Sequence, residues 1–453
     1  MEQKQKKVAI IGGGITGLVT AFNLKKEQIP FTIFESSNHM GGVIASHREN
    51  GFLYETGPNS GTISQPEVMD LFADLKDECK LEIANDASGK RLIWKGGRWH
   101  AMPSGIGSGI STPLFSLKDK LRILGEPFRK PGTNPNESLA DLVKRRMGQS
   151  FLDYAIDPFI LGIYAGDPQY IVPKYALPKL YNLEQNYGSF IGGAIKKRKE
   201  PKDENQKKAT GKIFSVEGGL EELVKALVRK LGKENIKTEC KDLSIKPAEN
   251  GFQIKGQNID ETFTHIVSTV NSAEVEKLFS FIGKETLAPI TRLKYARVTE
   301  VAVGFKKWNG ISLDAFGGLI PFKENRNLLG ALFMSTLFKD RAPEGGALIT
   351  TFVGGMRKAE LADLRDDELE NLIADEMKII MGMKDFKPDL LKTKSHSRAI
   401  AQYGADSGER IQAIETIEKK YPGLFLAGSM IGGIGMADRI KQGRTVTDRI
   451  IQS

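Results

Sequence analysis

The chain has 453 residues, of which 40% are hydrophobic and 27% are charged, an ordinary balance for a globular protein. A chain of this length is too long to fold around one simple hydrophobic core, so we expect two or three domains. The formal net charge of +9 would suit an anionic membrane surface or a polyanionic substrate. Because no stretch resembles a nucleic-acid-binding module, we expect no nucleic-acid partner.

Cysteine and histidine usage argues against a disulfide framework or a metal site. Cys79 and Cys240 are far apart and the five histidines have no ligand spacing, so we predict no metal. The polar N-terminus leads directly into an apolar stretch, which is not the pattern of a signal peptide. No apolar run reaches the roughly 18 residues that a membrane-spanning helix needs. We therefore expect a cytoplasmic protein and leave open a peripheral contact with the inner face of the cell membrane.

The first part of the chain has the order of a dinucleotide-binding fold. Residues 7–11 are an apolar run of strand character, residues 12–17 are glycine-rich, and residues 18–24 have helical spacing. A second β-rich run, residues 31–34, ends on Glu35. Strand, glycine turn, helix, strand and acid follow in the order that such a fold requires.

Each glycine of the turn has a physical role in this interpretation. Gly12 permits the tight turn, Gly14 lets a pyrophosphate approach the backbone, and Gly17 lets the helix pack closely on the sheet. The helix N-terminus offers free N–H groups to the phosphates. Glu35 lies 18 residues after Gly17, near the usual offset of the acid that binds an adenosine ribose. The alternative is a glycine-rich loop before an ordinary helix.

The residues after Glu35 favour FAD over NAD. A second Gly-Gly, Gly41-Gly42, resembles flavoproteins of the amine-oxidase and desaturase superfamily. Amine oxidases usually carry an Arg directly after this pair. Val43 stands there instead, which is more similar to the protoporphyrinogen oxidase branch.

The rest of the chain alternates between types of structure. Residues 90–103 read as a hairpin, and residues 104–195 contain helical runs whose apolar residues form a core or face a membrane. Residues 295–352 are β-rich and predict a second sheet. Near the end, residues 424–428 form a strand before a glycine-rich helix start, which again offers N–H groups to an anion or a flavin carbonyl.

These changes predict an α/β fold, and they match the three parts that the resemblance to the protoporphyrinogen oxidase branch implies. These parts are a Rossmann-like FAD-binding domain assembled from discontinuous segments, an α+β substrate domain and a helical subdomain. The expected boundaries are 1–88, 213–272 and 400–453 for the FAD-binding domain, 89–103 and 273–399 for the substrate-binding sheet, and 104–212 for the helical, membrane-associating part.

Over nearly its whole length the chain resembles the oxygen-dependent protoporphyrinogen/coproporphyrinogen oxidases of the HemY type. Several dispersed motifs in one order are more specific than any one motif alone. Besides the N-terminal fingerprint, the matching stretches are residues 54–58, 94–97, 162–167, 183–185, 214–220, 340–343, 351–355 and 432–436.

The resemblance implies an FAD-dependent enzyme of heme biosynthesis. The family removes six electrons from a porphyrinogen in three flavin cycles, and O2 reoxidises the flavin. The sequence leaves open whether protoporphyrinogen IX becomes protoporphyrin IX or coproporphyrinogen III becomes coproporphyrin III. Peripheral membrane contact and a homodimer also stay open.

The resemblance also assigns binding residues, although no catalytic side chain. The expected FAD contacts, with Cys240 acting through its backbone, are Gly12, Gly13, Gly14, Ile15, Thr16, Gly17, Glu35, Ser36, Gly42, Val43, Gly57, Pro58, Asn59, Ser60, Cys240, Ser429, Ile434, Gly435 and Met436. The expected substrate contacts, among which Arg91 would hold a propionate, are Arg91, Asn59, Gly162, Leu319, Leu332 and Phe352.

Two departures from the family pattern fall near the C-terminus. Gly428-Ser429 stands where the superfamily commonly has Gly-Asp, and Arg439 stands where relatives often have Cys. The rival enzymes are an amine oxidase or a carotenoid-desaturase-like oxidoreductase. The rival from another class is a flavin-free binding protein that keeps the fold.

Overall fold

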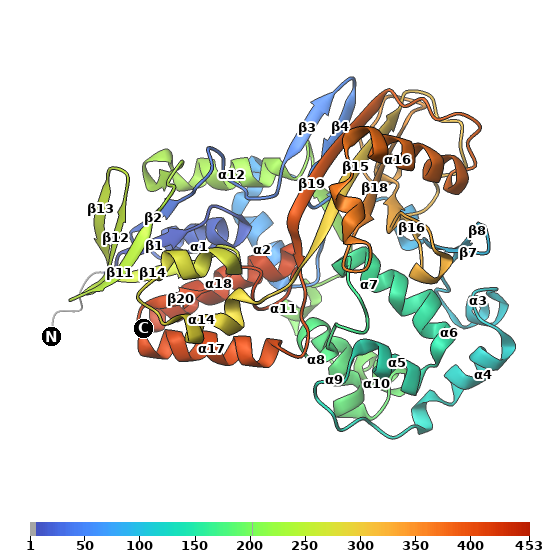
Figure 1. Cartoon of the computed structure of the whole chain (residues 1–453), viewed down its shortest axis with the longest axis horizontal. Coiled ribbons are helices and arrows are strands. Elements are labelled where there is room, and N and C mark those ends of the chain that lie inside the picture. Colours follow the sequence, from blue (N-terminus) through green and yellow to red (C-terminus); the bar gives the residue numbers. More distant parts are fainter. Residues whose placement is uncertain (1–5, 202) are drawn as a thin grey trace.

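The computed structural model describes residues 6–201 and 203–453. Figure 1 shows a parallel sheet with its helices on the left, a large sheet at the upper right and a group of helices at the lower right. The fold is therefore α/β, and its parallel sheet is built from discontinuous segments, as predicted.

The parallel sheet collects strands from three distant parts of the chain. Its order is β10 (Ile236–Lys237), β2 (Phe31–Phe34), β1 (Val8–Ile11), β14 (His265–Ser268) and β20 (Leu424–Leu426). Every residue of β1 and β14 is buried, because helices or a small sheet cover both faces. One face packs on α1 (Ile15–Lys26), α12 (Glu221–Leu231) and α18 (Met436–Gln452), and the other on α14 (Lys284–Thr291) and α17 (Ser407–Lys420).

Smaller elements complete this half of the molecule. They are α2 (Pro66–Leu75), α13 (Val275–Leu278), β3 (Ser46–Glu49), β4 (Phe52–Glu55), β5 (Gly61–Thr62), β6 (Leu81–Ile83), β9 (Ile213–Val216), β11 (Ser244–Ala248), β12 (Gly251–Gly256) and β13 (Ile259–Phe263). β3 pairs with β4, β9 lies between β5 and β6, and β12 lies between β11 and β13.

The large sheet has seven strands in the order β19, β15, β18, β17, β16, β7, β8. Their bounds are β19 (Leu390–Ala401), β15 (Tyr295–Phe305), β18 (Ala347–Gly354), β17 (Gly330–Leu332), β16 (Gly317–Leu319), β7 (Arg91–Lys95) and β8 (Arg98–Ala101). One face packs on α16 (Asp366–Ile380), and α15 (Met334–Leu337) lies after β17. The predicted hairpin is thus β7–β8, and it extends the predicted second sheet.

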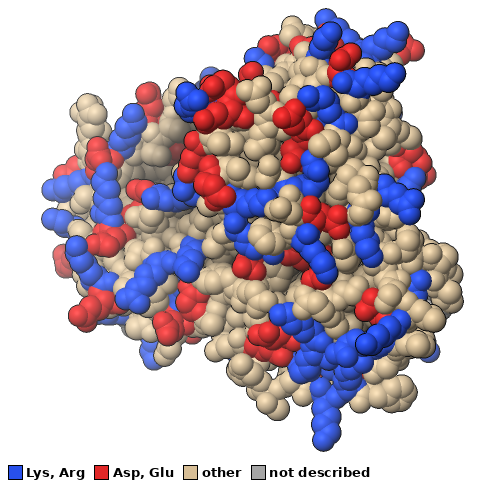
Figure 2. Space-filling model, turned by 45° about the vertical axis from the view of Figure 1, so that its right-hand side comes forward, with Lys and Arg blue, Asp and Glu red and all other residues tan. Residues whose placement is uncertain are grey.

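The segment between β8 and β9 is helical. Its helices are α3 (Ile106–Ser111), α4 (Leu117–Leu124), α5 (Leu139–Arg146), α6 (Gln149–Phe151), α7 (Asp157–Tyr164), α8 (Pro173–Ala176), α9 (Pro178–Tyr187), α10 (Phe190–Arg198) and α11 (Glu204–Lys207), with a 3₁₀ turn η3 (Glu126–Phe128). Lys and Arg side chains gather at the lower end of the molecule, over these helices (Figure 2). No helix within the described ranges has the length and apolar character needed to cross a bilayer.

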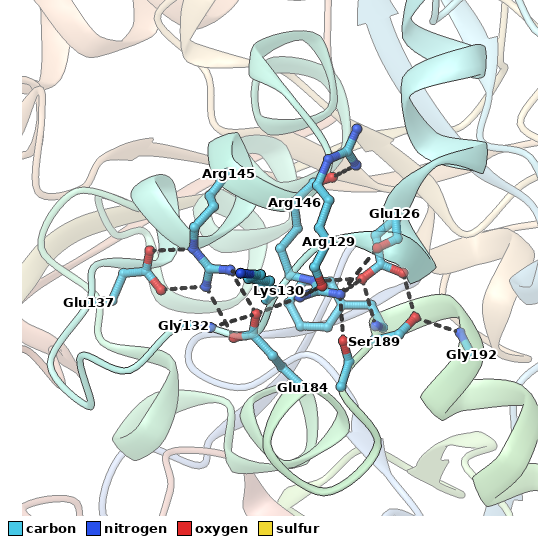
Figure 3. A network of polar contacts seen from close by, with 12 residues as sticks. Glu126, Arg129, Lys130, Gly132, Glu137, Arg145, Arg146, Glu184, Ser189 and Gly192 are labelled. Atoms are coloured by element: carbon cyan, nitrogen blue, oxygen red, sulfur yellow. Dashed lines mark hydrogen bonds and ion pairs between the residues drawn. The ribbon is translucent and has the colours of Figure 1, made fainter.

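A buried ion network holds the helical segment together (Figure 3). Arg146 at the end of α5 is fully buried and contacts both Glu126 of η3 and Glu184 of α9, the latter at 2.7 Å. Arg145 adds a second contact with Glu184 at 2.8 Å and reaches Glu137 near the surface. Burial alone would raise the pKa of Glu184, but the two arginines lower it below its usual value. The family motif at residues 183–185 therefore includes a side chain with a structural role.

Candidate active site

The glycine turn after β1 is open on one side and closed on the other. Gly12 has a φ of +108°, which favours glycine, and its N–H donates to the Phe34 carbonyl. A Cβ on Gly17 would lie 2.1 Å from the Gly12 carbonyl oxygen, so the helix packs too closely for any other residue. A Cβ on Gly14 would meet no atom within 4 Å. The turn therefore has room for a ligand at Gly14, where α1 begins without a side-chain cap.

Glu35 and two backbone segments surround this turn. Glu35 Oε2 accepts a hydrogen bond from the Gly13 N–H at 2.7 Å, and its Oε1 accepts one from the Ser37 N–H. The Gly41 N–H donates to the Gly13 carbonyl, and the Cys240 N–H donates to the Glu35 carbonyl. Residues predicted from three parts of the sequence thus meet at the ends of β1 and β2.

The glycine-rich start of α18 is organised by two polar side chains. The Tyr403 hydroxyl donates to the carbonyls of Ser429 and Gly433, each at 2.8 Å. Arg439 is buried and donates to the carbonyls of Gly428 and Ile431. The sequence alone did not explain why an arginine stands at position 439. In the structure its hydrogen bonds hold the loop that precedes α18.

Four of the six predicted substrate residues come from different strands and share one face of the large sheet. Residues opposite each other in neighbouring strands lie on the same face, and alternate residues of a strand do too. The registers pair Arg91 with Gly317, Leu319 with Gly330, and Leu332 with Thr350. Since Gly330 also pairs with Phe352, these registers place Arg91, Leu319, Leu332 and Phe352 on the face opposite α16.

Gly162 of α7 lies against this face. A Cβ there would be 2.5 Å from Leu319 Cδ2, so the helix approaches the sheet closely at this point. The Arg91 guanidinium lies 5.5 Å from the centre of the Phe316 ring and makes no hydrogen bond or ion pair with any described residue. Lys95, by contrast, donates to the carbonyls of Pro113 and Leu114. Arg91 is therefore free to bind an external anion.

A continuous series of contacts joins the glycine turn to the sheet face. A Cβ on Gly42 would be 3.3 Å from the Gly14 Cα, and a Cβ on Gly57 would be 1.9 Å from the Val43 carbonyl oxygen. Residues 57–60 therefore pack on the second Gly-Gly turn. From this loop, the Asn59 Nδ2 donates to Oε1 of Glu300 at 2.5 Å. The turn, the loop and the sheet face thus form one site.

Glu300 was not among the residues predicted from the sequence. It lies in β15 directly opposite Phe352, and only 3% of its surface is exposed. Burial raises the pKa of Glu300 to about 8; the hydrogen bond from Asn59 lowers it in part, and Glu55 raises it. The available signal was an acid in the apolar run of residues 298–305, at a position that a buried strand would normally fill with an apolar side chain.

A second buried pair explains several family motifs. Arg341 donates to Glu55 at 2.8 Å and to the Ser215 hydroxyl at 2.6 Å, and the charged partners are almost completely buried. Glu55 also accepts the Leu220 N–H. Residues 54–58, 214–220 and 340–343 are therefore linked by one structural ion pair next to the site.

The donor set of this site fits an elongated dinucleotide. Gly14 leaves an open approach to the backbone. The N-cap residues of α1 and α18 are Gly14 and Gly435, which offer no side-chain cap. The Gly435 N–H donates to Asp438 Oδ2. Glu35 supplies an acid at the end of β2. Within the described ranges no three His, Cys, Asp or Glu side chains form a group that could hold a metal.

Comparison with known proteins agrees with this geometry. Residues 15–451 match the family described as flavin containing amine oxidoreductase. The chain belongs to this family. It is an oxidoreductase, and its cofactor is FAD.

Individual relatives confirm the narrower resemblance seen in the sequence. The mitochondrial protoporphyrinogen oxidase of Nicotiana tabacum is 30% identical over 98% of this chain and 95% of its own. The coproporphyrinogen III oxidase of Bacillus subtilis (strain 168) is 27% identical over 98% of this chain and 97% of its own. A crystal structure of a protoporphyrinogen-oxidase-like protein from Exiguobacterium sp. 255-15 superposes with a TM-score of 0.83 at 22% identity, covering 99% of this chain and 100% of that one. That likeness shows the shared fold.

Proposed function

We propose that the protein oxidises a porphyrinogen to the corresponding porphyrin in heme biosynthesis, with O2 as the final electron acceptor. One observation carries the proposal: Leu319, Leu332 and Phe352 share a sheet face with Arg91, and Asn59 links that face to the glycine turn. The Arg91 guanidinium has no hydrogen-bond or ion-pair partner among the described residues. A porphyrinogen is a large apolar macrocycle with carboxylate side chains, which suits an apolar wall beside a free guanidinium. The two relatives act on such compounds by name.

We also propose which residues hold FAD. They are those predicted from the sequence, namely Gly12, Gly13, Gly14, Ile15, Thr16, Gly17, Glu35, Ser36, Gly42, Val43, Gly57, Pro58, Asn59, Ser60, Cys240, Ser429, Ile434, Gly435 and Met436. When bound, FAD supplies the acceptor for two electrons at a time. The open approach at Gly14 and the acid at Glu35 support this assignment.

The chain's own residues would bind and orient the substrate. Leu319, Leu332 and Phe352 are partly buried and would provide apolar contact and exclude water from the macrocycle. Arg91 binds a propionate through its planar guanidinium, which matches a carboxylate in two-point geometry. Gly162 lets α7 approach the wall without filling the space that a side chain would occupy.

The proposed activity is tested by turnover of each porphyrinogen in air, followed by porphyrin fluorescence. We expect rapid product from protoporphyrinogen IX or coproporphyrinogen III in a yellow protein. Faster turnover of one identifies the substrate. No fluorescence from either, together with oxidation of an amine or a polyene, would replace the proposal with an amine oxidase or a desaturase-like enzyme. A protein that stays colourless after FAD addition would point to a flavin-free binding protein.

We further propose peripheral contact with an anionic membrane. The apolar residues Leu117, Leu121 and Leu124 recur at helical spacing on α4 and are exposed, and Phe128 in η3 is 90% exposed. Exposed basic residues lie among them, and Figure 2 shows Lys and Arg side chains gathered over the helical segment. Apolar side chains with basic neighbours are typical of proteins that bind an anionic lipid surface.

The division into domains is proposed as predicted: residues 1–88, 213–272 and 400–453 bind FAD, 89–103 and 273–399 form the substrate sheet, and 104–212 form the helical part. The strand order of the two main sheets supports it, although β19 ends at Ala401 and α14 packs on α17. A cytoplasmic location and a homodimer stay predictions.

A further inference from the structure

Glu300 is a buried acid with no cationic partner in the part of the chain that the structure describes. Its Oε1 accepts the Asn59 amide, its Oε2 accepts no hydrogen bond from a described residue, and it forms no ion pair within the described ranges. Every other acid buried to a similar degree in this part of the molecule has an arginine, as Glu55 has Arg341. A buried carboxyl without a cation is costly when ionised, so it is retained for a reason other than stability.

None of the three titratable groups that face Glu300 from β4 and β19 forms an ion pair with its carboxyl. Glu55 faces it from β4 but is neutralised by Arg341. Lys394 lies opposite it on β19 but is exposed and makes no ion pair with it. His396, two residues further along that face, binds the Thr56 carbonyl, and burial lowers its pKa, so it is neutral at neutral pH.

Asn59 orients the carboxyl. Both N–H groups of its amide are used, one by Glu300 Oε1 and one by the Gly57 carbonyl at 3.2 Å. This fixes which oxygen of Glu300 faces the amide and leaves Oε2 for another partner. Because Glu300 and Phe352 share a sheet face, that partner belongs to whatever binds against the wall of Leu319, Leu332 and Phe352.

We propose that Glu300 is a catalytic residue: its Oε2 accepts the proton that the substrate releases in each two-electron oxidation. This rests on the proposed function. The N–H bond, or a tautomeric C–H bond, breaks and its electron pair stays in the macrocycle while the proton forms an O–H bond with Oε2. FAD held at the glycine turn would supply the acceptor for the hydride lost in the same oxidation. The proton passes to water before the next cycle.

The test is the pH dependence of flavin reduction by the porphyrinogen, measured without oxygen in wild type and in Glu300→Gln. A general base typically contributes about 10²-fold or more. We expect the wild-type rate to rise with pH through an apparent pKa near 8, and the variant to be about 10²-fold slower with no such rise. A wild-type rate that is flat over this range overturns the proposal without any variant.

The matched control is Glu376→Gln. Glu376 is an equally buried acid on α16, against the opposite face of the sheet, where it binds Arg326 at 2.7 Å. Its variant should keep the pH-dependent rise. If Glu300→Gln keeps that rise as well, or slows the rate equally at every pH, the inference is wrong.

Unfolding provides a second measurement that does not depend on the substrate. Burial raises the pKa of Glu300 to about 8 in the folded protein, whereas the ordinary pKa of a glutamate in the unfolded chain is 4.5. Wild-type stability should therefore fall as pH rises between these values, by up to about tenfold in the folding equilibrium constant per pH unit. Glu300→Gln should remove this fall. If the variant loses this fall but porphyrinogens are not oxidised, the proposed function is wrong, whereas Glu300 is still the titrating acid. If the fall persists in the variant, Glu300 is not the titrating group and the inference is wrong.

Discussion

Arg91 is exposed at the start of β7, and its guanidinium has no partner among the described residues except the Phe316 ring. Replacing it by methionine keeps the apolar stem but removes the charge. We predict that Arg91→Met raises the KM for a porphyrinogen about tenfold to hundredfold, the value of one charge-assisted carboxylate contact, and changes kcat little. Steady-state kinetics would measure both.

The control for Arg91 is Arg98→Met on the neighbouring strand of the same hairpin, at its exposed tip. It removes the same charge at a position that was not assigned to the substrate. A rise in KM for Arg98→Met equal to that for Arg91→Met would mean that general charge, and not a propionate contact, binds the substrate.

Gly14 tests the cofactor site because no atom of residues 6–201 and 203–453 would contact a Cβ at this position. A Cβ there meets no atom within 4 Å, and its φ of −70° suits alanine. We therefore predict that Gly14→Ala folds normally but copurifies with much less FAD, because the methyl group occupies the approach of the pyrophosphate. Flavin absorbance per protein and the thermal midpoint would report the two effects.

Gly109→Ala is the control for Gly14→Ala. It adds the same methyl group in helix α3, also with no atom within 4 Å. It should retain full FAD content. Equal FAD content in both variants would contradict the assignment of the glycine turn.

The strand, turn and helix elements near the N-terminus are predictable because their signals are local. Gly12, Gly17 and Glu35 act within one strand–turn–helix–strand unit, where spacing along the sequence determines position in space. The pair of Asn59 and Glu300 was not predictable in the same way. It joins a loop to a strand 241 residues away, and its existence depends on which face of β15 meets that loop.

The order of the large sheet was hidden for a similar reason. β7 pairs in parallel with β16, although more than 200 residues separate Arg91 from Gly317 in the chain, and no local pattern specifies such a pairing. Arg439 likewise gains its role only from the distant carbonyls of a folded loop. The resemblance identified residues that the sheet then brought onto one face, but not the acid between them.

The network between α5, α9 and η3 predicts a stability effect. Glu184→Gln leaves fully buried Arg146 with one acid fewer, and breaking a buried ion pair typically costs about 3–5 kcal/mol. Glu137→Gln removes a more exposed partner of Arg145 and should cost about 1 kcal/mol or less. Chemical unfolding would compare them, and equal costs would contradict the structural role assigned to Glu184.

The helical segment between β8 and β9 exposes apolar and basic side chains on the surface of the molecule. We predict that the wild-type protein sediments with vesicles of phosphatidylserine and phosphatidylcholine, and that Leu121→Glu combined with Phe128→Glu abolishes this binding. Ile379→Glu on α16 is the control, since Ile379 is also an exposed apolar residue. Vesicle binding that is unaffected by the double variant would contradict the proposed membrane contact.

The arrangement of the two main sheets also explains why each is assembled from segments that are distant in the sequence. The parallel sheet with its glycine turn and the large sheet with its apolar face are each assembled from separate segments, and they meet at the loop of residues 57–60. A cofactor held at the first and a macrocycle held at the second would therefore lie next to each other. We therefore propose that electrons pass from the macrocycle to the cofactor at this junction.

The most direct test of this electron transfer is anaerobic mixing of the yellow protein with a porphyrinogen, recording flavin absorbance and porphyrin fluorescence together. We predict that the flavin absorbance is lost as fluorescence appears, and that it returns when O2 is admitted. Flavin absorbance that is unchanged by protoporphyrinogen IX and by coproporphyrinogen III, in a protein that an amine or a polyene does reduce, would contradict electron transfer from a porphyrinogen.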